Sequence, residues 1–191
     1  MALRQSRMLA LGTPAPDFSL SDSSGRKYSL EAFRDSRGLL VAFICNHCPY
    51  VKHILEGFAA FANEYQDRGL ATLAISSNDV VAYPQDSPAE MARLAREHGF
   101  RFPYLYDESQ SVARAYEAVC TPDLFLFDRD RRLVYRGQFD GSRPGNKVPV
   151  TGSDLRAAAD AVLRGTPVPP NQVASAGCSM KWKKGNEPGW A

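Results

Sequence analysis

The chain has no long apolar run. Among its 191 residues the longest such run is residues 39–44, far shorter than the roughly 20 residues that a membrane-spanning helix needs. The first ten residues include basic side chains but no sustained apolar stretch of the kind that a secretory leader carries. We therefore expect a cytoplasmic protein with no membrane partner.

The chain also lacks a block of like charge. It has 23 Lys and Arg residues against 21 Asp and Glu residues, which gives a formal net charge of +2. Proteins that bind nucleic acids usually gather basic side chains into one run or onto one face. Because no such run is present, we expect no nucleic-acid partner.

Cysteine is scarce. The chain has four cysteines, Cys45, Cys48, Cys120 and Cys178, which are too few for a disulfide-stabilised scaffold. In a reducing compartment, closely spaced cysteines are more often catalytic or metal-binding than structural. The spacing therefore directs attention to Cys45 and Cys48.

Short strands alternate with helices, which predicts an α/β domain with a central mixed β-sheet and helices on both faces. The apolar runs at 39–44 and 70–75 are typical of strands buried on both faces. We predict strands near residues 18–20, 28–30, 38–44, 70–75, 104–106, 123–127 and 133–136, and helices near 29–33, 49–65, 87–98, 109–119 and 153–163.

The first two of these strands form an N-terminal β-hairpin extension around a glycine turn. Residues 12–165 are predicted to form one domain. An N-terminal arm at 1–11 precedes it. Residues 166–191 are rich in Pro, Gly, Lys and Asn, and we predict an irregular C-terminal tail there.

The segment Cys45-Asn46-His47-Cys48-Pro49 follows a buried strand and opens a helix. A helix N-terminus favours a thiolate over a thiol, and two intervening residues let the second sulfur reach the first. We expect Cys45 to attack a substrate disulfide and Cys48 to resolve the mixed disulfide. Asn46, His47 and Pro49 would tune the site. A protonated His47 would lower the pKa of Cys45, and Pro49 is tolerated in the first helical turn.

Residues 12–165 resemble the thioredoxin-like superfamily, within it the redoxin branch related to alkyl hydroperoxide reductase (AhpC/TSA) and to TlpA-type thiol–disulfide oxidoreductases. The resemblance rests on Pro14-Ala15-Pro16-Asp17-Phe18, on residues 43–49 around the cysteines, and on Thr121-Pro122 before a strand. It implies a thioredoxin-like fold with a cis bond before Pro122.

The resemblance also implies that Thr121 and Pro122 bind substrate, because in this fold the backbone before the proline is free to hold an extended chain. Protein or small-molecule disulfides and thiols are the implied substrates. A thiol or thioredoxin-type protein is the implied electron donor, and no cofactor or metal is implied.

Peroxiredoxins of the same branch differ at two positions. They have threonine where this chain has Cys45, and an arginine near the position of Pro122. The peroxide-activating set is thus incomplete, which favours disulfide exchange. A peroxidase with an antioxidant role, in which Cys48 attacks and Cys45 resolves, is the alternative.

The group that deprotonates Cys48 is not evident. Thioredoxins carry a buried acid nine residues before the first cysteine, and Ser36 occupies that position here. Glu56, Asp79 and His53 are the substitutes that the sequence offers.

A third possibility is a non-enzymatic zinc- or partner-binding module. Its ligands would be drawn from Cys45, His47, Cys48 and His53, with Cys120 or Cys178 completing the set.

Two further cysteines are candidate additional thiols. Cys120 stands two residues before Pro122, so it is either a thiol near the site or a small buried residue. The tail around Cys178 either folds back onto Cys45 or Cys48, or lies on the surface with one buried thiol.

Overall fold

The computed structural model describes residues 3–190. Its helices are η1 (Leu30–Phe33), α1 (Pro49–Asp67), η2 (Pro84–Asp86), α2 (Pro88–Glu97), α3 (Ser111–Ala115) and α4 (Ser153–Arg164). Its strands are β1 (Leu3–Gln5), β2 (Ser19–Asp22), β3 (Lys27–Ser29), β4 (Gly38–Phe43), β5 (Leu70–Ser76), β6 (Tyr104–Tyr106), β7 (Cys120–Thr121), β8 (Asp123–Phe127), β9 (Leu133–Tyr135) and β10 (Ala176–Ser179).

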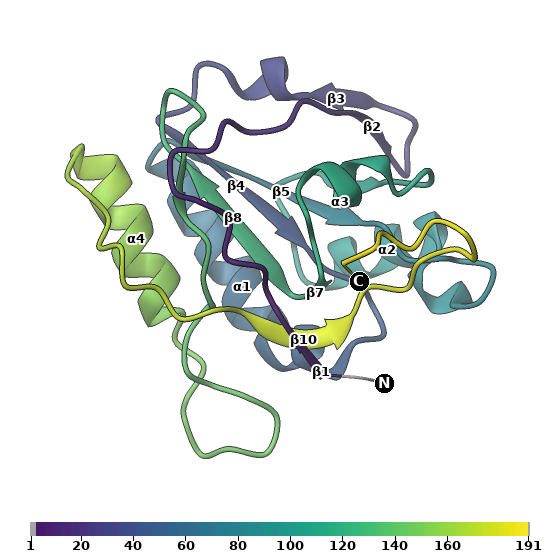
Figure 1. Ribbon diagram of the computed structural model, residues 1–191. Helices are drawn as coiled ribbons and strands as arrows, with labels where there is room; N and C mark the ends of the chain where they lie inside the picture. The colour runs from purple at the N-terminus through teal and green to yellow at the C-terminus, as the bar shows by residue number, and fades with distance from the viewer. Residues whose placement is uncertain (1–2, 191) are drawn as a thin grey trace.

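The main sheet has seven strands in the order β3-β2-β6-β5-β4-β8-β9. The pairs β4–β5 and β5–β6 are parallel, and the remaining pairs are antiparallel. β4 lies between β5 and β8 with every residue buried, as its uninterrupted apolar sequence predicts. The predicted mixed sheet and the N-terminal hairpin, β2 and β3, are confirmed (Figure 1).

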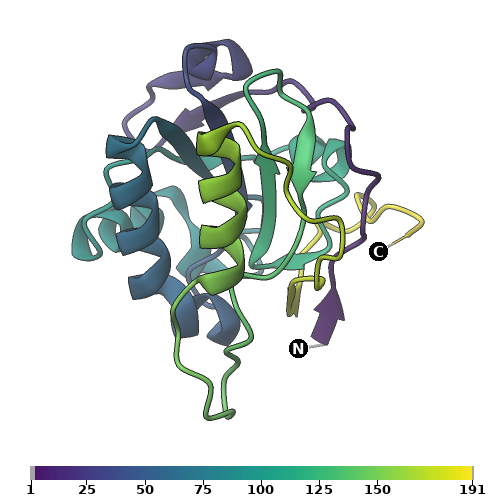
Figure 2. The same cartoon turned by 90° about the vertical axis from the view of Figure 1, so that its left-hand side faces the viewer.

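Helices cover both faces of this sheet. Leu40 and Ala42 of β4 enter the core beneath α1 and α4, whereas Leu39, Val41 and Phe43 enter the core that contains α3. This division follows from the alternation of side chains along a strand. Figure 2 shows α1 and α4 side by side over one face, which confirms the predicted layers.

The helix that begins directly after Cys48, α1, buries its apolar side in the core. Its buried residues recur at helical spacing: Val51, Ile54, Leu55, Phe58, Ala59, Phe61, Ala62 and Tyr65. Cys48 is the N-cap residue and Pro49 the first helical residue, where the missing N–H of proline costs no helical hydrogen bond. The start of α1 is therefore fixed at the cysteine motif.

A second sheet, β1-β10-β7, lies outside the main one. The tail predicted to be irregular thus contributes β10, and the N-terminal arm contributes β1. β10 runs antiparallel to β7, with Cys178 opposite Thr121, and Figure 1 shows it crossing the lower part of the molecule. Gly177 permits this approach, because a Cβ there would lie 2.0 Å from the Thr121 carbonyl oxygen.

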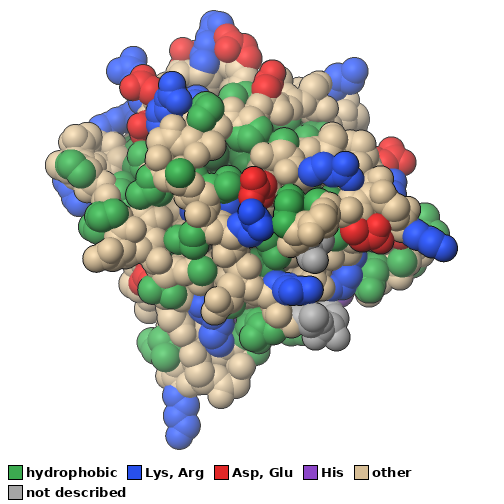
Figure 3. Space-filling view, viewed as in Figure 1, with side chains coloured by type: hydrophobic (Ala, Val, Ile, Leu, Met, Phe, Trp, Pro, Cys, Tyr) green, Lys and Arg blue, Asp and Glu red, His purple; other side chains and the backbone are tan. Residues whose placement is uncertain are grey.

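Charged side chains are dispersed on the face that Figure 3 shows, where basic and acidic groups alternate. Among the residues described, no helix is both long and apolar enough to cross a membrane.

Candidate active site

The two cysteines of the motif lie together where β4 leads into α1. Cys45 is 1% exposed and Cys48 is 0% exposed. Both are free thiols, and the hydroxyl and carbonyl oxygens of one residue, Thr121, lie beside the two sulfurs. The predicted pair is therefore brought together, at the positive end of a 19-residue helix.

The loop before β8 faces this pair. The Thr121–Pro122 peptide bond is cis, as expected. The Thr121 hydroxyl lies 3.3 Å from Cys45 Sγ, and the Thr121 carbonyl oxygen lies 3.1 Å from Cys48 Sγ. The backbone of Thr121 is not free, however, because β10 of the same chain pairs with it. The expectation of an open site for an extended substrate is corrected in this respect.

A fully buried acid, Asp86 in η2, holds the motif from the other side. Its Oδ1 accepts the backbone N–H groups of Asn46 at 2.8 Å and His47 at 3.2 Å. Its Oδ2 lies 2.6 Å from His47 Nδ1 and accepts Asn78 Nδ2 at 2.8 Å. Burial raises the pKa of Asp86, but the hydrogen bond with His47 and then that with Asn78 bring it below its ordinary value.

Asn46 and His47 have further contacts that fix their orientation. The Asn46 amide donates to the Gln85 carbonyl at 3.0 Å and accepts the Tyr104 hydroxyl at 3.1 Å. The His47 ring stacks on Tyr83 with a centroid distance of 5.0 Å. These contacts bind the motif to the segment around η2.

Within the pair, the pKa values of the two thiols shift in opposite directions. The hydrogen bond from Cys45 lowers the pKa of Cys48 to about 4, against the effect of burial and with help from Cys178 and Thr121. The same bond, burial and the charge of Asp86 raise the pKa of Cys45 well above its ordinary value. The expected lowering of the Cys45 pKa by His47 is thus wrong, because the acid that orients His47 also repels a thiolate on Cys45.

The tail brings a third sulfur to the motif. The Cys178 thiol is in hydrogen-bond contact with Cys48, and burial together with this contact raises the pKa of Cys178 to about 12. Cys178 is 5% exposed and also contacts the backbone of Tyr50 in the first turn of α1. Of the two alternatives for the tail, the structure shows the folded-back one.

Cys120 belongs to a different environment. Its thiol faces the Pro122 carbonyl oxygen at 3.5 Å, and burial followed by the charge of Asp123 raises its pKa. Ser6 of the N-terminal arm also contacts it. Cys120 is therefore a buried residue behind the loop.

None of the three substitutes for the missing thioredoxin acid faces the pair. His53 Nε2 bonds Ser142 Oγ at 2.7 Å, Asp79 accepts the Val81 N–H at 3.0 Å, and Glu56 is exposed. Asp86 is the acid that sequence reasoning missed. Its separation from the motif left no local pattern, although its position between Pro84 and Pro88 marked a rigid turn.

The proposed zinc ligands are not assembled as predicted. In the described part of the chain, ligand atoms of Cys45, His47 and Asp86 lie within 4.8 Å of one another, without Cys48 or His53. Both oxygens of Asp86 already accept hydrogen bonds from Asn46, His47 or Asn78. These bonds orient the His47 imidazole and the loop that carries it.

Comparison with known proteins agrees with the geometry. The model of the AhpC/TSA family matches residues 11–136. This chain belongs to the AhpC/TSA family. The match includes β4, the cysteine motif, η2 and the cis-proline loop, so the family assignment rests on the segments that build the site.

Relatives of this AhpC/TSA protein extend the comparison. The thiol-disulfide oxidoreductase ResA of Geobacillus thermodenitrificans (strain NG80-2) is 28% identical over 125 residues, which is 65% of this chain and 67% of ResA. A hypothetical protein from Sinorhizobium meliloti 1021 has a crystal structure with 54% identity and a TM-score of 0.94, covering 95% of this chain and 99% of that one.

The thioredoxin domain of a thiol-disulfide oxidoreductase from Bacteroides vulgatus superimposes with a TM-score of 0.58 at 18% identity, over 78% of this chain and 97% of that domain. The fold is thus thioredoxin-like, and the AhpC/TSA protein is an oxidoreductase of that superfamily.

Proposed function

We propose that this oxidoreductase exchanges thiols and disulfides through Cys45 and Cys48. The observation that supports the proposal most strongly is that both sulfurs lie beside Thr121 of the cis-proline loop, at the N-terminus of α1. Two thiols so placed are suited to form and release one disulfide.

The position of the charge sets the order of attack. Cys48 attacks one sulfur of the substrate disulfide as the thiolate, and the other substrate sulfur leaves as a thiolate that takes up a proton. Cys45 then loses its proton and attacks Cys48, which releases the bound substrate thiol and leaves the Cys45–Cys48 disulfide. This order reverses the sequence expectation, in which Cys45 attacks first.

Substrates of this exchange are protein or small-molecule disulfides and thiols, and a thiol or a thioredoxin-type protein returns the electrons. A pocket of about 640 Å³ borders Asn46 and His47 and offers substrate a place beside the motif. Reduced thiols dominate in the cytoplasm, where we place the protein, and this favours net reduction of the substrate.

Serine variants test the proposal. In Cys45→Ser/Cys178→Ser the attacking thiolate remains but neither neighbouring thiol can resolve the adduct, so an aromatic disulfide that releases a coloured thiol leaves a stable mixed disulfide on Cys48. Cys48→Ser forms this adduct far more slowly, and Cys120→Ser behaves as wild type. Full exchange activity in both Cys45→Ser and Cys48→Ser would show that this pair is not the site.

A second candidate is a peroxidase, which the lowered pKa of Cys48 favours. Cys48 occupies the peroxide-attacking position of the branch, and its thiolate would be oxidised to a sulfenic acid that Cys45 resolves. Consumption of a hydroperoxide with a dithiol donor, abolished in Cys48→Ser, would establish this activity. The cis-proline position holds Pro122 in place of the expected arginine, so exchange remains the first choice.

A further inference from the structure

We propose that Cys178 is a third redox thiol. It attacks Cys48 in the Cys45–Cys48 disulfide and forms a Cys48–Cys178 disulfide. The proposal rests on the proposed function, since it needs that first disulfide. It concerns a segment outside the part of the chain that the family model matches.

β10 lies directly against the cis-proline loop. The Ser175 hydroxyl donates to the Pro122 carbonyl at 2.8 Å, and the Met180 N–H donates to the Val119 carbonyl at 2.9 Å. Between them, Gly177 leaves room for the Thr121 carbonyl oxygen. The strand thus occupies the place at Thr121 where an extended peptide would pair.

Within this strand, Cys178 is the residue opposite Thr121. Its side chain joins the core cluster that contains Cys45 and Cys48, and the carbonyl oxygen of the facing Thr121 lies 3.1 Å from Cys48 Sγ. Cys120 has no place in that cluster. The tail therefore presents a thiol to Cys48 as a bound peptide substrate would.

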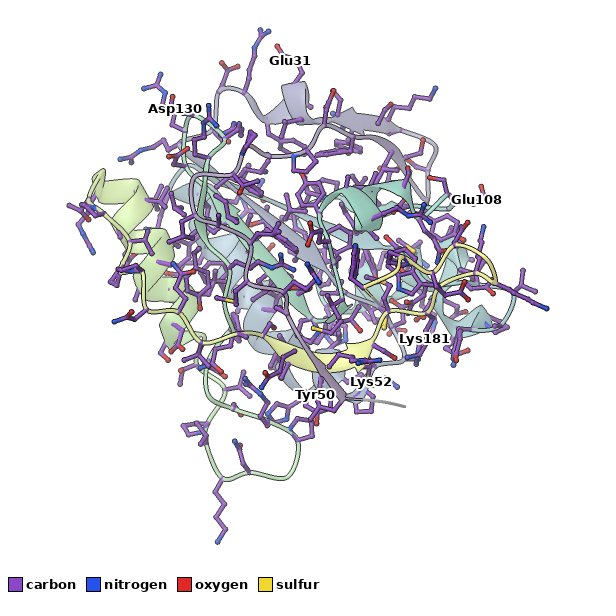
Figure 4. The ribbon with its side chains drawn as sticks, in the orientation of Figure 1. Glu31, Tyr50, Lys52, Glu108, Asp130 and Lys181 are labelled. Atoms are coloured by element: carbon purple, nitrogen blue, oxygen red, sulfur yellow. The ribbon has the colours of Figure 1, made fainter. Side chains whose placement is uncertain are left out.

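In this step the Cys178 thiol must lose its proton, and burial and then Cys48 raise its pKa to about 12. The charge of Lys181, on the same segment (Figure 4), opposes that rise. The Lys181 ammonium lies 5.8 Å from the Tyr83 ring centroid, and Tyr83 stacks on His47. When Cys48 is in a disulfide it carries no charge, so its contribution to the raised pKa of Cys178 is lost. Burial, the larger cause, remains.

The step balances within the chain. Cys178 gives up its proton and attacks Cys48 Sγ, the Cys45–Cys48 bond breaks, and Cys45 leaves as a thiolate that takes up a proton. One disulfide is consumed and one is formed, so no external oxidant or reductant takes part. The product leaves Cys45 free beside Asp86.

Peptide mapping of the full chain tests this step. Trypsin leaves Cys45 and Cys48 on residues 38–52 and Cys178 on residues 165–181. In Cys45→Ser treated with a mild thiol oxidant such as diamide, we expect these two peptides to be joined. The link should be absent in Cys48→Ser and unchanged in a Cys45→Ser/Cys120→Ser double variant.

Wild-type protein tests the transfer itself. After stoichiometric oxidation and rapid alkylation, we expect the alkyl label on Cys45 in wild type and on neither motif cysteine in Cys178→Ser. A Cys45–Cys48 disulfide with no link to Cys178, in protein that retains exchange activity, would overturn the role of Cys178 alone. Loss of exchange activity together with the absence of any Cys45–Cys48 disulfide would overturn the proposed function.

Discussion

Replacement of Asp86 by asparagine tests whether the Asp86 carboxylate holds the cysteine motif in place. Asparagine has nearly the same shape, and its carbonyl oxygen can still accept the backbone N–H groups of Asn46 and His47. Its NH2 group then faces His47 Nδ1 and Asn78 Nδ2, which now bond the carboxylate at 2.6 and 2.8 Å. A hydrogen bond to a charged group contributes about 1.5–3 kcal/mol, so loss of both would cost about 3–6 kcal/mol. A neutral His47 can accept the new NH2 group, so we expect the lower end, about 3 kcal/mol.

Acid should remove this difference. The pKa of Asp86 lies below its ordinary value of 3.8, so its carboxylate stabilises the folded state fully above that value. The contribution is lost as the pH falls through the lowered pKa. The difference in unfolding free energy between wild type and Asp86→Asn should therefore be constant near neutral pH and shrink in strong acid.

Urea unfolding of the reduced proteins measures this effect, with Asp79→Asn as the matched control. Asp79 is a half-buried acid that accepts one backbone N–H, from Val81, and its amide variant should stay within about 0.5 kcal/mol of wild type. The charge of Asp86 raises the pKa of Cys45, so Asp86→Asn should also lower that pKa. An Asp86→Asn protein as stable as Asp79→Asn, with unchanged Cys45 reactivity, would refute this account of the site.

Three further outcomes follow from the buried thiols. The pKa of Cys48 is about 4, so its alkylation should be nearly independent of pH near neutrality and fall as the pH drops through about 4; a midpoint at the ordinary 9.0 would contradict the assignment. Gly177→Ala places a Cβ against the Thr121 carbonyl, and an overpacking cost of about 1–2 kcal/mol should speed alkylation of Cys48 about 5- to 30-fold. Gly189→Ala is the control, because a Cβ there meets only open space. Amide hydrogen exchange in β10 should be faster in Cys178→Ala than in Cys120→Ala, and equal rates would show that Cys178 does not hold the strand.

Much of the main sheet could be predicted because its strands carry strong local signals. The apolar runs that became β4 and β5, and the helical spacing in α1, each had one consistent interpretation. Where the sequence pattern was weaker, the predicted helix boundaries differ from those of the structure. The helix predicted at 109–119 is limited to Ser111–Ala115.

The strands β1, β7 and β10 could not be predicted, because each has two to four residues and no alternating pattern. Their pairing joins residues far apart in the sequence, from 57 positions for Thr121 with Cys178 to 175 positions for Leu3 with Cys178. Only the folded chain shows that Gly177 is needed for this contact. Sequence could therefore offer both alternatives for the tail without choosing between them.

The same limitation explains the site. The cysteine pair and the cis proline were accessible because a strand, a helix and a proline fix their geometry locally. Asp86 was not, because its function depends on the backbone of Asn46 and His47, 40 and 39 residues away. The sequence also did not reveal one electrostatic effect. Asp86, the acid that orients His47, lies close enough to Cys45 for its negative charge to disfavour a thiolate there.

The positions of these groups make the two ends of the motif chemically unequal. Asp86 disfavours a thiolate on Cys45, whereas Cys48 receives hydrogen bonds from Cys45 and Cys178 at the start of α1. A charge confined to Cys48 strengthens the contact that holds Cys178, since a hydrogen bond to an ionised acceptor is stronger than one between neutral groups. Formation of the Cys45–Cys48 disulfide removes that charge, which weakens the hold on β10 while leaving Cys178 next to the sulfur that it would attack. In the proposed transfer, the redox state of the pair and the attachment of the tail would both depend on one atom, Cys48 Sγ.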